Sequence, residues 1–153
     1  MAKKLLVQPI LGIVARPITI AKRDEDGRIV WKDEEKKIPQ EEKMDTVSAL
    51  EFISLSIPPE LQTKNDSIQA FRVFERIFAS KKEWKDGDGE RFISLEDGEY
   101  DWIFRVLDRK VPLSKEQKEM PGLEPRTLAQ YWWGMNAYAV ERQLRVGGDR
   151  DLP

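Results

Sequence analysis

The segment "DTVSALEFISLSIPP", residues 45–59, marks the point at which the chain changes its hydrophobic period. Its apolar residues recur with helical spacing, at Val47, Leu50, Ile53 or Phe52, and Ile57. Asp45 or Thr46 can cap the start of such a helix, and the proline pair that closes the segment ends it. We therefore expect a helix over about 46–56, preceded by chain of a different kind.

The residues before this helix have the composition of extended chain. Residues 5–20 are rich in Val, Ile and Leu, with prolines and a glycine between them. Further on, "PITIAK" (17–22) alternates in polarity and "RIVWK" (28–32) is β-branched and aromatic, with the short loop "RDEDG" between them. This arrangement predicts a β-hairpin. The charged segment 32–43 that follows is expected to be a solvated linker or the tip of a second hairpin.

Helical spacing returns three more times after residue 59. A second helix is predicted over about 66–82, capped by Asn65 or Asp66, and a third is predicted to begin at Ser94. A fourth, of about 22 residues, is predicted from Pro125 onward and is expected to stop at a pair of glycines. The faces predicted to be buried are Ile68, Phe71, Phe74, Ile77 and Phe78 in the second helix, Tyr100, Ile103, Phe104 and Leu107 in the third, and Leu128, Tyr131, Trp132, Met135, Tyr138 and Ala139 in the fourth.

Together these elements predict an α+β fold. An N-terminal β-hairpin with extended strands is expected to precede a mainly α-helical bundle of about four helices. The expected organisation is an N-terminal β element with a charged linker over 1–44, a helical domain over 45–146 and a flexible tail over 147–153. We find no internal repeat and no long low-complexity segment.

Composition excludes several classes of function. The chain has 153 residues, a net charge of −2, no cysteine and no histidine. Disulfide scaffolds, zinc sites built on Cys or His, and Ser-His-Asp or Cys-His nucleophile systems are therefore impossible. We expect no enzyme activity, catalytic residue, cofactor or metal. The apolar N-terminus is interrupted by Gln8, Pro9, Arg16 and Pro17, so neither a signal peptide nor a membrane-spanning helix is expected.

Two acidic segments resemble calcium loops in part. "DEDGRIVW" (24–31) has suitably spaced acids, but Lys22 falls where the first ligand should be, so we interpret the segment as a turn. The loop 86–97 places Asp86, Asp88, Glu90 and Asp97 at ligand positions. However, Arg91 stands where a calcium loop needs glycine. A plain loop between helices is favoured, and divalent-ion binding stays as an alternative.

Basic residues gather on and after the second predicted helix. Arg72, Arg76, Lys81 and Lys82 could contact phosphates, which suggests a nucleic-acid alternative. Cations also favour helix C-termini, and acidic residues are interleaved with these. With a slightly negative net charge, we do not expect nucleic acid to be the main partner.

The segment "YWWGMNAY", residues 131–138, is the most suggestive feature for function. Successive helical residues lie about 100° apart, so its aromatic side chains cannot all face one core. Trp132 fits the predicted buried stripe, and Trp133 is then expected to point elsewhere. Aromatic residues and Met are enriched in protein interfaces. We hypothesise an interface formed by Tyr131, Trp132, Trp133, Met135 and Tyr138, with a helix buried on most sides as the alternative.

The order of several segments resembles small proteins of unassigned function encoded by tailed phages and prophages. The segments that carry the resemblance are "RPITIAKRDEDGRIVW", "DTVSALEFISL", "QAFRVFERIFA" and "FISLEDGEYDWIFRVL", within about 16–110. The chain departs from that pattern in the charged insert 32–43 and in the aromatic C-terminal helix. The resemblance implies no catalytic residue and no cofactor. It implies a setting among late phage genes, whose products complete themselves on neighbouring proteins.

The expected function is therefore non-enzymatic. We expect a phage protein that acts in virion assembly or as a minor structural component, through contacts with itself or with other phage structural proteins. It is expected in the virion or the host cytoplasm, with no membrane partner. The alternatives are a small regulator that binds a host protein or nucleic acid, and a divalent-ion-binding protein that uses the loop 86–97.

Overall fold

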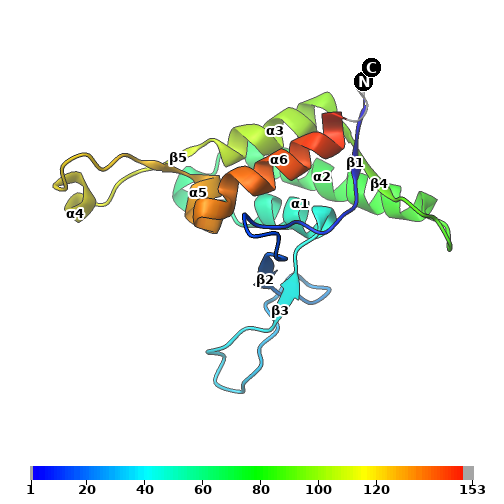
Figure 1. Cartoon of the computed structure of the whole chain (residues 1–153), viewed down its shortest axis with the longest axis horizontal. Coiled ribbons are helices and arrows are strands. Elements are labelled where there is room, and N and C mark those ends of the chain that lie inside the picture. The colour runs from blue at the N-terminus through cyan, green and yellow to red at the C-terminus, as the bar shows by residue number, and fades with distance from the viewer. Residues whose placement is uncertain (1, 150–153) are drawn as a thin grey trace.

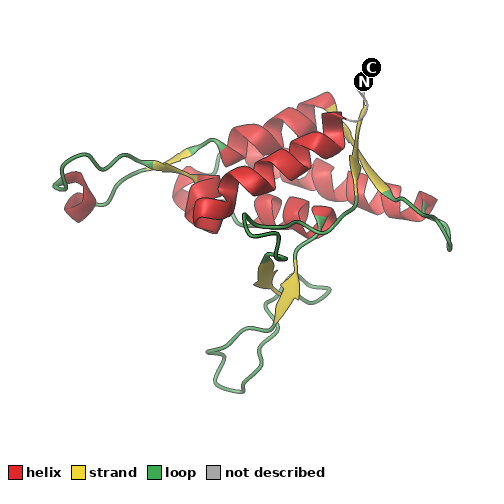
Figure 2. Cartoon of the chain, viewed as in Figure 1, coloured by secondary structure: helices red, strands yellow, loops and turns green. Residues whose placement is uncertain are grey.

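A computed structural model describes residues 2–149 as a body of packed helices from which three narrower parts project (Figures 1 and 2). The four longest helices are α1 (Thr46–Leu55), α2 (Lys64–Glu83), α3 (Asp97–Leu107) and α6 (Ala137–Asp149). The projections are the β2–β3 arm, the β5–α4–β6 arm and the loop between α2 and β4. The fold is α+β, as the sequence predicts.

The first strand belongs to the helical body. β1 (Ala2–Leu6) pairs antiparallel with β4 (Phe92–Glu96), in a register that runs from Ala2 opposite Glu96 to Leu6 opposite Phe92. Leu5, Ile93 and Leu95 are buried beneath this pair. The predicted N-terminal unit 1–44 is therefore split, because β1 joins the body whereas β2 and β3 form a separate arm.

The β2–β3 arm contains two turns. β2 (Thr19–Ala21) pairs antiparallel with β3 (Glu41–Lys43). The chain between them folds back twice. Arg23 and Ile29 form an antiparallel β-bridge at the predicted hairpin loop, and Trp31 and Pro39 form another at the second turn. The charged insert is thus the tip of a second hairpin. In the first turn, the Asp24 carboxylate accepts hydrogen bonds from the backbone N–H groups of residues 26 and 28, so the turn interpretation of "DEDGRIVW" is confirmed.

Local signals set the starts of the first two long helices. Asp45 caps α1 as predicted, since its carboxylate accepts from Ser48 N while its own N–H donates to the Ser48 hydroxyl. The predicted cap of α2 was wrong. Thr63 occupies that position and Asp66 is its partner in a capping box. The η1 turn (Pro59–Leu61) connects the two helices.

The buried face of α2 differs from the predicted one. Val73 and Ile77 are buried, on a helix that packs against α1, β4 and α3. Ile68 is exposed, and so are Phe71 and Phe78, at 66% and 63%. The sequence of α2 contains two apolar faces, one with Phe71 and Phe78 and one with Val73. The neighbouring elements cover the face that contains Val73 and leave the other exposed.

The third helix begins later than predicted. Residues 92–96 form β4, so Ser94 lies in a strand and α3 starts at Asp97. Ser94 N donates instead to the Ser80 hydroxyl on α2. The predicted face of this helix is confirmed, because all four of its members are buried: Tyr100, Ile103, Phe104 and Leu107.

The fourth predicted helix is broken. The chain forms β5 (Lys110–Val111), α4 (Lys115–Lys118), β6 (Arg126–Thr127), α5 (Leu128–Trp133) and the η2 turn (Gly134–Asn136) before α6. Gly134 has φ +56° and ψ −126°, which ends α5. Thr127, not Pro125, starts α5, and its hydroxyl accepts from Gln130 N. α6 continues through the glycine pair to Asp149, so the predicted tail begins too early, and 150–153 lie outside the described residues.

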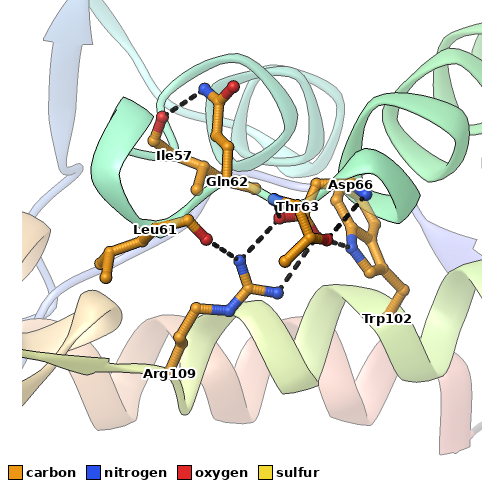
Figure 3. A network of polar contacts seen from close by, with 7 residues as sticks. All are labelled: Ile57, Leu61, Gln62, Thr63, Asp66, Trp102 and Arg109. Atoms are coloured by element: carbon orange, nitrogen blue, oxygen red, sulfur yellow. Dashed lines mark hydrogen bonds and ion pairs between the residues drawn. The ribbon is translucent and has the colours of Figure 1, made fainter.

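A buried polar network fastens the start of α2 to the end of α3 (Figure 3). Asp66 accepts hydrogen bonds from Trp102 Nε1 at 2.9 Å and from both terminal nitrogens of Arg109 at 2.8 and 3.0 Å. Arg109 also donates to the Leu61 carbonyl at 2.9 Å, and Thr63 N donates to Asp66 at 2.8 Å. Because Arg109 immediately precedes β5, this network fixes the base of the β5–α4–β6 arm.

Candidate protein interface

A tight turn at residues 12–16 projects from the chain between β1 and β2. Gly12 N donates to the Arg16 carbonyl at 2.9 Å, and Ala15 N donates to the Gly12 carbonyl at 3.0 Å. Ala15 has φ +56°, a left-handed conformation that costs a non-glycine residue about 1 kcal/mol. The surrounding contacts must therefore hold the turn in place.

Those contacts come from η2 and α6. The Gln143 side chain bonds both backbone groups of Leu11, accepting from N at 2.9 Å and donating to O at 2.6 Å. The side-chain amide oxygen Oδ1 of Asn136 accepts from Ile13 N at 2.9 Å. Gly12 lies so close to Asn136 that an added Cβ would meet its Oδ1 at 2.6 Å. The turn is thus pinned to the C-terminal helices by side chains that are distant in sequence.

The turn and the C-terminal elements that hold it expose four large apolar side chains. Ile13 and Val14 are 62% and 73% exposed at the tip of the turn. On the adjacent C-terminal elements, Met135 is 86% and Tyr138 73% exposed. Ile13 and Tyr138 also line a shared hollow of about 780 Å³ between the turn and α6. We call these four residues the turn patch.

The predicted aromatic interface is divided by the break at Gly134. Met135 and Tyr138 belong to the turn patch. Trp132 and Trp133 instead pack together against Phe52 of α1, with ring centroids 5.3 and 5.7 Å from its ring. The expectation that Trp133 points away from Trp132 was wrong, because α5 ends there and both rings turn toward α1. Tyr131 stays exposed, with the Arg126 guanidinium over its ring at 5.8 Å.

The residues of the nucleic-acid alternative do not form one surface. Lys81 lies nine residues after Arg72 in α2, which at about 100° per residue places it on the opposite side of the helix. Arg76 is paired with Glu99 at 2.9 Å. Lys82 Nζ lies 4.4 Å from the Phe78 ring centroid. Phosphate contacts by these four residues would need different faces of α2.

The loop 86–97 does not have the conformation of a calcium loop. Its second half is strand β4, and the Asp88 carboxylate accepts from Lys85 N within a local turn. Among residues 2–149, no group of three or more acidic side chains is placed to hold a metal ion. Asp97 begins α3, so it does not close a loop around an ion.

The sequence did not identify Ile13 and Val14 as site residues. Residues 5–20 were predicted to be extended chain, and two β-branched residues there suit a buried strand equally well. The available signal was the sequence "LGIVARP", in which glycine and proline flank two apolar residues at turn spacing. Their exposure depends on Asn136 and Gln143, which only the fold brings near.

Comparison with known proteins finds no protein-family model, no curated protein and no solved structure that matches the chain. No helix within residues 2–149 is both long and apolar enough to cross a membrane.

Proposed function

We propose that this chain is a non-enzymatic subunit or assembly factor that acts through protein–protein contacts, in or during assembly of a tailed-phage virion. The observation that carries the proposal is the turn patch, in which Ile13 and Val14 are presented to solvent by a turn that other elements pin. The phage setting rests on the resemblance of residues 16–110 to small phage-encoded proteins.

The energetics of the turn favour a binding role. Burying a Val or Ile side chain contributes about 1.5–3 kcal/mol. A partner that covers the turn patch would gain this free energy without the entropic cost of ordering the turn, because Asn136 and Gln143 already hold it. Contiguous exposed apolar patches mark interaction surfaces in monomeric proteins, and this is the role we assign to the turn patch.

The arms are consistent with the same function. A two-stranded hairpin is only marginally stable in water, and each sheet in the described chain has two strands. The arms also expose Ile38, Met120 and Leu123. Contacts with a neighbouring subunit would stabilise these projections.

Site-specific photo-cross-linking in the producing cell tests the proposal. A photoreactive amino acid is placed at Val14, or, as the control, at Asp101, an exposed position on α3 that belongs to neither proposed surface. We expect adducts of discrete mass, with a second copy or another protein, from position 14 and none from position 101. Equal adducts from both positions, or none from position 14, would refute the proposal.

A further inference from the structure

A second apolar hollow lies where the β2–β3 arm meets α1 and α2. Its cavity is about 140 Å³. Ile20 of β2, Phe52 and Leu55 of α1, and Phe74 of α2 form its apolar walls. It shares no lining residue with the hollow beside the turn patch. We call it the arm groove.

The arm groove continues onto an exposed aromatic stripe. Phe71, Phe74 and Phe78 are spaced three and four residues apart, so they follow one another along one side of α2. Phe74 lines the groove, whereas most of the Phe71 and Phe78 surface is open to solvent. Leu55 at the end of α1 is also exposed. A ligand in the groove could therefore extend over several uncovered apolar side chains.

The groove lining is strongly acidic. It contains the carboxylates of Asp24, Glu25, Glu42 and Glu51 and a single cation, Arg23. Asp24 is committed to backbone N–H groups of its own turn, and Arg23 donates to the Gly27 carbonyl at 2.8 Å. Within the described residues, the other three carboxylates make no hydrogen bond or ion pair. The lining thus complements a cation.

Glu51 is the most constrained of these carboxylates. It is partly buried at the groove, between Ser48 and Phe52 of α1. Burial raises the pKa of Glu51, and the negative charges of Asp45 and Glu42 raise it further, while Lys81 lowers it. A cationic side chain that entered the groove would offset this repulsion. It would also pair with a carboxylate that folding has already partly desolvated.

We propose that the arm groove binds a basic amphipathic helix of another protein, which lays its apolar face on the Phe71–Phe74–Phe78 stripe and places a lysine or arginine at Glu51. Docking of an apolar helical face in a groove, with flanking charges that set orientation, is a common mode of peptide recognition. This surface is separate from the turn patch, so the two proposals stand or fall independently.

Two synthetic helical peptides with the same leucine face test the inference, one with lysines and one with glutamates on its flanks. Binding to the intact chain is measured by fluorescence anisotropy at physiological salt, which weakens non-specific attraction. We expect the lysine peptide to bind and the glutamate peptide not to bind. Glu51→Gln should weaken the lysine peptide about tenfold, equivalent to about 1.4 kcal/mol.

Two further variants separate the groove from general attraction to acidic residues. Phe71→Ser, at an exposed position, should also weaken the lysine peptide, whereas Glu116→Gln on the distant α4 should not. Circular dichroism checks that each variant is folded. Equal losses from Glu51→Gln and Glu116→Gln, or absence of binding by the lysine peptide, would overturn the inference. Loss of self-association on Glu51→Gln without peptide would identify a second copy as the occupant and would also overturn it.

Discussion

Replacement of Asp66 by alanine should be the most damaging single change to a polar residue of the helical body. The Asp66 carboxylate is almost fully buried and accepts four hydrogen bonds, from Trp102, from Thr63 N and twice from Arg109. Its side chain and that of Arg109 are 5% and 25% exposed. Alanine would leave the guanidinium and the indole N–H without their acceptor.

The magnitude follows from the burial of the pair. Removing one partner of a buried ion pair costs about 3–5 kcal/mol. Arg109 keeps some contact with water and its bond to the Leu61 carbonyl, so the lower end applies, about 3 kcal/mol. With a urea slope of about 1–3 kcal/mol/M, this loss lowers the midpoint of unfolding by about 1–3 M.

Urea titration followed by tryptophan fluorescence and circular dichroism measures this shift. The matched control is Asp101→Ala, which removes an exposed carboxylate from α3 and should change stability by less than about 0.5 kcal/mol. The double variant Asp66→Ala, Arg109→Ala should be less destabilised than the sum of the two single variants. A loss below about 1 kcal/mol for Asp66→Ala, or strict additivity, would refute the reasoning.

The remaining predictions concern pH and glycines. Burial raises the pKa of Asp66, but hydrogen bonds from Arg109, Trp102 and Thr63 outweigh it and hold the folded-state pKa below the ordinary 3.8. The ionised Asp66 carboxylate therefore stabilises the fold above about pH 3.8, and this stabilisation is lost as the pH falls further and the carboxylate is protonated. The urea midpoint of Asp66→Asn should accordingly fall less between neutral and acid pH than that of the unchanged protein. Gly134→Ala should cost about 1–3 kcal/mol in thermal unfolding because of its positive φ. Gly98 lies on α3 with open space around its Cα, so Gly98→Ala should instead stabilise the fold by about 0.4–1 kcal/mol. A Gly134→Ala variant more stable than Gly98→Ala would contradict this reasoning. Gly12→Ala should destabilise by about 1 kcal/mol by displacing Asn136 from Ile13 N, and should cost less in an Asn136→Ala background.

Much of the local structure was predictable because its causes are neighbours in sequence. The Asp45 cap, the first hairpin turn and the buried face of α3 all depend on residues within a few positions of one another. The Thr63 cap was equally local, since a Thr three residues before an Asp is a capping-box signal that the prediction missed.

The candidate site was predictable only in part. Met135 and Tyr138 were identified by their type, since aromatic residues and Met are common in interfaces. Trp132 and Trp133 were assigned to the same surface because a continuous helix was assumed. The positive φ of Gly134 breaks that helix and turns both rings onto Phe52.

The sequence by itself determined where the period changes at Asp45, where most helices and turns lie, and which chemistries the lack of Cys and His excludes. Only the tertiary structure decided that β1 pairs with β4, that Asp66 meets Arg109, and that Phe71 faces water while Val73 does not. The reason is physical. Caps and turns satisfy backbone groups with nearby side chains, whereas a strand edge, a buried charge or an apolar helix face can be satisfied by many distant partners, and packing of the whole chain selects among them.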